Sequence, residues 1–172
     1  MERAAWVALS SLTGLGPVRF RKVLEIFGSA VGALEAGAEE IRERAGLPES
    51  LVEGLADACG RLEDIREELV KLEERGVRAL IWEDEDYPTR LARTSSAPPV
   101  LWWTGPAEPN GSEWVVAVDG SREATGEGCE EARRVGAELC RAGLAVVSGL
   151  AAGIDAAAHE GCLLYTSDAA DE

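Results

Sequence analysis

Two glycine-bearing turns carry the residue types from which a binding site could be built. The first turn, Gly120-Ser121-Arg122, follows the apolar segment 114–119, and the second, 148–153, follows another apolar segment. Each turn precedes a sequence with helical spacing, and the first amides of a helix are unpaired and lie at the positive end of the helix dipole. Glycine lets another molecule approach the backbone, and arginine presents a planar set of donors that suits phosphate oxygens. The pattern therefore predicts a site for a ligand that carries phosphate.

Cofactor-binding signatures do not occur in the chain. The glycines at 126 and 128 are followed by Glu131, where the dinucleotide fingerprint requires a third glycine, and no GxxxxGK[ST] loop is present. The single histidine and the four widely spaced cysteines do not provide the spacing of a zinc site. We therefore expect no cofactor and no metal, and we expect reduced thiols, as is usual in a cytoplasmic protein.

Ser148, Asp155 and His159 have the residue types of a hydrolase triad, but their context does not favour catalysis. The nucleophile motif GxSxG is missing. Asp155 and His159 are one helical turn apart, so a simple contact between them is the plainer interpretation. The negative charge of Asp155 in a first helical turn also interacts favourably with the helix dipole, and this needs no ligand. We expect a binding protein and not an enzyme.

The elements that must position the two turns are predicted by hydrophobic periodicity. Apolar residues recur at three- and four-residue spacing in five segments, which are 4–12, 17–27, 30–36, 38–45 and 48–74. Two short strand candidates follow at 77–82 and 100–103. From residue 114 onward, a strand, a helix over 123–141, a strand over 144–148 and a helix from about residue 154 alternate, which predicts a parallel sheet covered by helices on both faces.

We therefore expect an α/β fold in which a truncated Rossmann-like parallel sheet follows a small all-α domain. Residues 1–75 are the predicted helical domain, and residues 76–161 are the predicted incomplete Rossmann-like domain. Ligands of open parallel sheets bind at the carboxyl ends of the strands. Both glycine turns are consequently expected to face the same crevice.

Several short motifs resemble the DNA-processing protein A family, which is also called DprA or Smf. They occur in the family's order over roughly residues 80–161, as Tyr87-Pro88 with Leu91, Pro99-Val100-Leu101 with Gly105, Gly120-Ser121-Arg122, Ser148-Gly149-Leu150-Ala151, Gly153-Ile154-Asp155 and Ala158-His159. The resemblance implies a Rossmann-like protein that binds single-stranded DNA and assists the loading of a RecA-type recombinase, notably in natural transformation. It also implies a homodimer when the protein is complete.

Carried over to this chain, the resemblance implies that both turns form a pocket for DNA phosphate. The residues assigned to this pocket are Gly120, Ser121, Arg122, Ser148, Gly149, Gly153 and Asp155. For Arg122 the alternative is an ion pair with Asp119 or with the helix that begins at Glu123. Asp119 departs from the family pattern, which has an apolar residue before the GSR turn, and its carboxylate would repel phosphate unless it points away.

A second DNA contact is implied near the N-terminus. The segment 12–19 resembles the hairpin of a helix-hairpin-helix (SAM-like) module, in which a Gly-hydrophobic-Gly sequence lets two backbone amides meet one DNA phosphate. The candidate residues are Gly14, Gly16 and Arg19, and residues 13–27 hold three bases against one acid. The alternative is an ordinary turn between two helices.

The net charge of −15 argues against indiscriminate binding to nucleic acid. Much of it is local, because residues 49–86 hold thirteen acids against five bases, which is typical of a solvated helical face. No apolar run is long enough to span a membrane, and the N-terminus lacks a signal-peptide pattern. We expect a cytoplasmic protein with no membrane partner.

The last residues, CLLYTSDAADE, depart from the family's pattern and resemble translated adapter sequence. We therefore expect residues 162–172 to be a non-native tail and the remaining strands of the Rossmann-like sheet to be missing. The alternative function is a Rossmann-type nucleotide-binding enzyme or sensor of the phosphoribohydrolase-like kind. The absence of that group's catalytic Glu and Arg motifs counts against this alternative.

Overall fold

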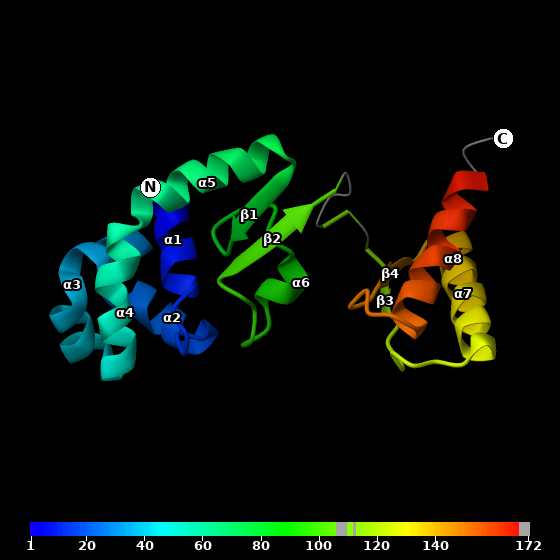
Figure 1. Ribbon diagram of the computed structural model, residues 1–172, viewed down its shortest axis with the longest axis horizontal. Helices are drawn as coiled ribbons and strands as arrows, with labels where there is room; N and C mark the ends of the chain where they lie inside the picture. Colours follow the sequence, from blue (N-terminus) through cyan, green and yellow to red (C-terminus); the bar gives the residue numbers. More distant parts are fainter. Residues whose placement is uncertain (106–109, 112, 169–172) are drawn as a thin grey trace. The chain divides into compact units, whose positions relative to one another are not determined.

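The computed structural model describes residues 1–105, 110–111 and 113–168. The chain forms two compact units, Met1–Asn110 and Gly111–Glu172 (Figure 1). The first is mainly helical, and the second contains a parallel strand pair with two helices. The predicted fold class is confirmed, because a helical region precedes a small parallel sheet of the Rossmann-like kind.

The first unit begins with five helices that follow the predicted periodicity closely. They are α1 (Glu2–Ser10), α2 (Pro17–Phe27), α3 (Ala30–Ala45), α4 (Glu49–Gly60) and α5 (Leu62–Glu74). The interruption predicted between 36 and 38 is present, because Gly37 leaves helical geometry with φ at +82°. The segment 48–74 differs from the single predicted helix, since Arg61 (φ −97°, ψ 3°) separates α4 from α5.

A β-hairpin completes the first unit. β1 (Val77–Ile81) and β2 (Val100–Thr104) pair in antiparallel fashion, with Val77 opposite Thr104, and the short α6 (Thr89–Ala92) lies between them in the chain. Trp82, directly after β1, meets Trp6 of α1 and Phe20 of α2 with ring centroids 5.5 and 5.6 Å apart. This aromatic cluster attaches the hairpin to the helices. The compact unit consequently ends at Asn110, which differs from the predicted division after residue 75.

The second unit is a strand–helix–strand–helix arrangement. β3 (Val115–Ala117) and β4 (Ala145–Val147) pair in parallel, connected by α7 (Gly126–Arg141) and followed by α8 (Ile154–Asp168). α7 begins three residues later than predicted, because the side chain of Thr125 accepts a hydrogen bond from Gly128 N–H (3.1 Å) and caps the helix.

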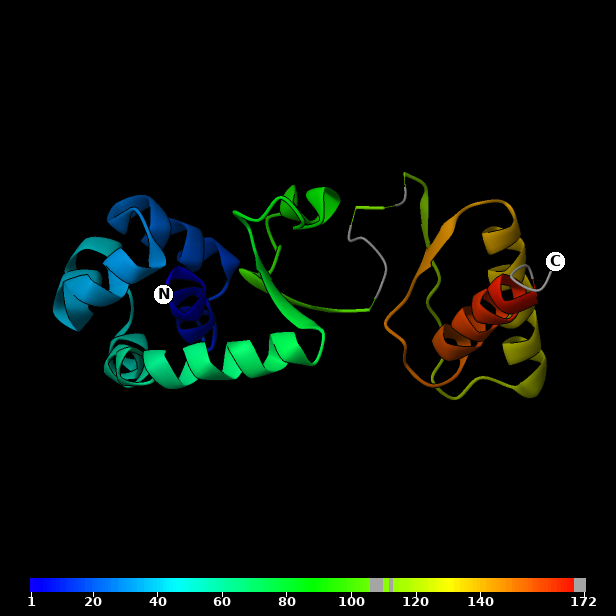
Figure 2. The same ribbon diagram turned by 90° about the horizontal axis from the view of Figure 1, so that it is seen from above.

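Both helices lie on the same side of the β3–β4 pair (Figure 2). Val115 and Val147 are 39% and 52% exposed. In the described residues the sheet therefore lacks the predicted cover on both faces. Two strands provide too few neighbours to bury both surfaces of their apolar sequences.

Glycines allow α7 and α8 to pack closely. A Cβ atom on Gly136 of α7 would lie 2.1 Å from the carbonyl oxygen of Ala158, and one on Gly161 of α8 would lie 1.9 Å from that of Arg133. Neither distance is possible for a real side chain, so both positions require glycine. The exposed pair Arg133–Glu160 (2.7 Å) also joins the two helices.

The same close packing brings Cys140 and Cys162 together in a disulfide, with their Cα atoms 5.6 Å apart. The prediction that all thiols are reduced is wrong for this pair, whereas Cys59 and Cys129 are free. α8 continues through Cys162 into the segment that we expect to be a non-native tail, and residues 169–172 of that segment lie outside the described residues.

Gly136→Ala tests the helix–helix contact. The added methyl group meets the backbone of α8, so we expect the second unit to lose about 1–3 kcal/mol of unfolding free energy. Denaturant unfolding followed by far-ultraviolet circular dichroism measures the loss. Gly126→Ala is the matched control, because a Cβ atom there meets nothing within 4 Å. Equal stability of the two variants would contradict the close contact.

Candidate nucleic-acid interface

The two turns of the second unit lie at the same end of the parallel strand pair. The turn containing Gly120, Ser121 and Arg122 follows β3, and the turn 148–153 follows β4. Strand pairing extends one step further, because Val118 N–H donates to the carbonyl of Val147 (3.0 Å). In the observed register both turns therefore lie at the carboxyl ends of paired parallel strands.

Hydrogen bonds join the two turns directly. Ile154 N–H, at the start of α8, donates to the carbonyl of Ser121 (3.2 Å). Gly120 N–H donates to Oδ1 of Asp155, also at 3.2 Å. The turns are consequently one continuous structure, in which the position of each depends on the other.

Close packing inside the protein explains two of the predicted glycines. A Cβ atom on Gly120 would lie 2.7 Å from the side chain of Ile154. A Cβ atom on Gly153, where φ is +89°, would lie 2.2 Å from the carbonyl oxygen of Ser121. The sequence suggested that these glycines leave room for a ligand, but here the room is taken by the neighbouring turn. Gly149, by contrast, is exposed.

The Asp155 carboxylate is the buried polar group of this region, with 2% of the residue exposed. The Ser148 hydroxyl chiefly lowers the pKa of the Asp155 carboxyl, and the backbone amides of Gly120, Ala151 and Gly149 act in the same direction, whereas burial opposes them. The Ser148 hydroxyl that acts on this carboxyl is itself buried. The carboxylate faces the protein's own donors, which makes Asp155 a positioning residue for both turns.

Arg122 is the cation of the first turn, and it is exposed. In the part of the chain that the structure describes, its guanidinium has neither a hydrogen bond nor an ion pair, so the alternative pairing with Asp119 or with α7 is not formed. Ser121 is exposed as well, and its hydroxyl accepts from Glu123 N–H (3.1 Å). Asp119 is exposed beside them. Arg122 is consequently available to an anion.

One residue of the second turn, Leu150, belongs to the family-like motif but was not assigned to the pocket. Leu150 adopts a φ of +53°, which is rare for a residue other than glycine, and its side chain is 69% exposed. Its positive φ could not be predicted from the residue type, because leucine ordinarily avoids this backbone conformation. The leucine places an apolar side chain on the surface between Gly149 and Ala151.

The N-terminal hairpin, residues 12–19, connects α1 to α2. Gly14 has a φ of +96°, Leu15 is buried at 4% exposure, and Gly16 precedes α2 in an extended conformation. Within the described residues, the amides of Gly14 and Gly16 donate no hydrogen bond. Arg19 is exposed and donates from Nη1 to the carbonyl of Gly14 (2.8 Å), which holds its charge beside the hairpin. The arrangement offers backbone donors and a cation to an anion.

The fold and these turns define a Rossmann-like α/β protein with a helical N-terminal region. Residues 78–170 match the family model of DNA recombination-mediator protein A, and the chain belongs to this family. It is 32% identical over 165 residues to Protein Smf from Synechocystis sp.. The match covers 94% of this chain and 41% of that relative, so the chain spans about two fifths of the relative's length.

The described residues contain no helix that is long and apolar enough to cross a membrane. They also contain no group of three or more His, Cys, Asp or Glu side chains arranged to hold a metal ion.

Acidification tests the role of Asp155. Because its pKa is lower in the folded protein than in the unfolded chain, its contribution to stability is present above the unfolded value of about 4 and is lost as the pH falls through the folded pKa. We expect Asp155→Asn to be less stable than the parent at pH 7. As the pH falls below about 5, the variant should lose less unfolding free energy than the parent does. Unfolding curves at a series of pH values measure both effects.

Asp119→Asn is the control for this series, because it removes an exposed carboxylate from the neighbouring turn. Its unfolding curves should follow those of the parent at every pH. If Asp155→Asn also followed the parent, the carboxylate would not hold the turns together.

Proposed function

We propose that this chain binds single-stranded DNA through phosphate contacts at the turns after β3 and β4, and that it catalyses no reaction and needs no cofactor. Membership in the DNA recombination-mediator protein A family supports a role in DNA recombination. The exposed Arg122, without a partner in the described residues, is the observation that carries the proposal. An arginine of this kind suits a phosphate that passes the carboxyl end of the strand pair.

The physical setting of Arg122 favours an anion. α7 and α8 both begin beside the two turns, so the positive ends of their dipoles lie there. The amides of Gly120 and Gly149 already serve the Asp155 carboxylate, and the Ser148 hydroxyl is buried, which leaves Arg122 and the exposed Ser121 as the candidate contacts. Contacts to phosphate carry no base information, so binding should be insensitive to sequence.

The N-terminal hairpin is the second proposed contact. The amides of Gly14 and Gly16, which donate no hydrogen bond within the described ranges, form with Arg19 a donor set that suits one further phosphate. Arg21 lies with its guanidinium 4.0 Å from the ring centroid of Trp82, and Lys22 donates to the carbonyl of Ala45 (2.7 Å). These bases give the α2 side of the first unit a local positive charge despite the overall charge of −15.

The same proposal extends to the complete protein. We propose that it assists the loading of a RecA-type recombinase, takes part in natural transformation, is cytoplasmic and forms a homodimer. These parts of the proposal rest on the family resemblance and on the relation to Protein Smf. Because the chain spans about two fifths of that relative, these activities are proposed for the complete protein.

Arg122→Ala is the direct test of the phosphate contact. We expect weaker binding to single-stranded oligonucleotides of any sequence, and the slope of log affinity against log salt should decrease by about 0.7, as for one lost contact. Fluorescence anisotropy over a salt series gives both quantities. Arg141→Ala is the control, because it removes an exposed arginine at the other end of α7 and should change neither.

Parent-like binding by Arg122→Ala at low and moderate salt would rule out the pocket. A mononucleotide that competes as effectively as an oligonucleotide would point instead to the alternative, a nucleotide-binding enzyme or sensor.

Asp119→Val tests whether the carboxylate beside Arg122 opposes DNA binding. Asp119 is exposed beside the turn, so its negative charge opposes a bound phosphate. We expect the variant to bind single-stranded DNA more tightly in the same anisotropy assay, with the largest gain at low salt. Unchanged affinity would show that the carboxylate points away from the DNA.

A further inference from the structure

An apolar groove lies on the first unit, within Met1–Asn110. It has a volume of about 440 Å³ and is formed by side chains from α1, α5 and β2. Its apolar lining consists of Val7, Ile65, Leu69, Leu72 and Trp102. It shares no residue with the two turns or the N-terminal hairpin.

α5 provides one wall of the groove. Ile65, Leu69 and Leu72 recur at helical spacing on one face and are half-buried, and no residue of α5 is fully buried. Most of a helix's stability in a protein comes from an apolar face that packs against something. The described residues cover this face only in part.

Trp102 of β2 also lines the groove, and it is 49% exposed. The neighbouring Trp103 is half-buried, as alternation along a strand requires. An exposed tryptophan beside a row of aliphatic side chains is typical of a surface that binds another protein, because tryptophan dominates the binding energy of many interfaces.

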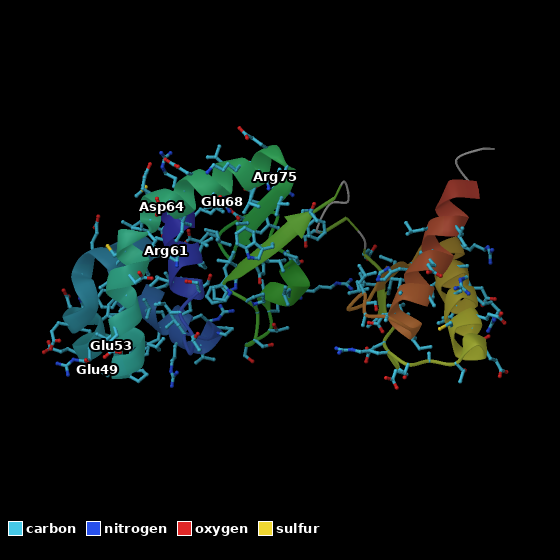
Figure 3. All side chains as sticks on the ribbon, in the orientation of Figure 1. Glu49, Glu53, Arg61, Asp64, Glu68 and Arg75 are labelled. Atoms are coloured by element: carbon cyan, nitrogen blue, oxygen red, sulfur yellow. A yellow bond between two sulfur atoms is a disulfide. The ribbon has the colours of Figure 1, made fainter. Side chains whose placement is uncertain are left out.

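The charge around the groove is negative. α5 carries six acids against two bases, and two of the acids, Asp64 and Glu68, line the groove. Figure 3 shows Arg61, Asp64 and Glu68 following one another from the end of α4 along α5. The guanidinium of Arg61 lies 3.9 Å from Asp57, which offsets its charge. Glu68 lies 3.9 Å from Nζ of Lys71 in an exposed pair, whereas Asp64 has no ion pair in the part of the chain that the structure describes.

We propose that this groove docks a basic amphipathic helix of a partner protein. Apolar side chains at i, i+3 or i+4, and i+7 of that helix fill the space between Leu69 and Trp102, and its lysines or arginines face Asp64 and Glu68. The charge argues against the other occupants. Nucleic acid and anionic lipid are repelled by the acids, and a symmetric contact with a second copy would set the acids of one α5 against those of the other.

A synthetic helix tests this proposal on the full chain. The probe is an amidated peptide of leucine, lysine and alanine of about 18 residues, which is long enough to form an isolated helix. Its leucines follow the stated spacing and its lysines flank them. We expect saturable binding by isothermal titration calorimetry, and no comparable binding of a scrambled peptide or of a peptide with glutamates in place of the lysines.

Substitutions on the groove locate the binding. Trp102→Ala and Glu68→Lys should each weaken the affinity about tenfold. Their controls are Trp114→Ala, which removes an exposed tryptophan of the other unit, and Glu67→Lys, which reverses an exposed charge that does not line the groove. Both controls should bind like the parent. Trp102→Ala should also retain the parent's affinity for single-stranded DNA, which separates this test from that of the proposed function.

Equal binding of the scrambled peptide, or parent-like binding by both groove variants, would overturn the proposal. Circular dichroism establishes that the variants are folded. A parent dimer that Trp102→Ala converts to a monomer in light scattering would also overturn it, because a second copy would then occupy the groove.

Discussion

The arrangement of the second unit depends on one buried carboxylate. Asp155 lies at the start of α8 and binds the amide of Gly120 in the turn after β3. A buried charge is costly unless it is well bonded, so this contact strongly favours one relative position of the two turns. Arg122, the exposed arginine that we propose for phosphate binding, lies in the turn whose position the Asp155 carboxylate fixes. The candidate site is thus positioned by a negative charge, although its proposed ligand is an anion.

Local sequence signals predicted the fold class and most element positions. The break at Gly37, the parallel order of β3 and β4, and the turns at their carboxyl ends follow from periodicity and from glycine placement, which act over a few residues. The break at Arg61 was not predicted, because the apolar spacing continues across it.

Contacts between distant residues could not be predicted in this way. Trp6 and Trp82 are far apart in the sequence, and contacts such as theirs show that the β1–β2 hairpin belongs with the helices. The glycines at 120 and 153 were correctly singled out, but a sequence cannot distinguish room for a ligand from room for the adjoining turn. Likewise, the close approach of α7 and α8 at Gly136 is visible only in the structure, and with it the Cys140–Cys162 bond.

The two arginines proposed to meet DNA differ in how far they are preorganised. Arg19 is already held by the carbonyl of Gly14, so its side chain has given up part of its rotational freedom before any ligand arrives. Arg122 has no such restraint in the described residues and must be immobilised on binding, which costs about 0.5–1.5 kcal/mol for a side chain of this length. In the proposed complex, the N-terminal hairpin with Arg19 therefore acts as a rigid contact, and the turn after β3 with Arg122 acts as an adaptable one. A flexible single strand, whose phosphates vary in position, is suited to this combination.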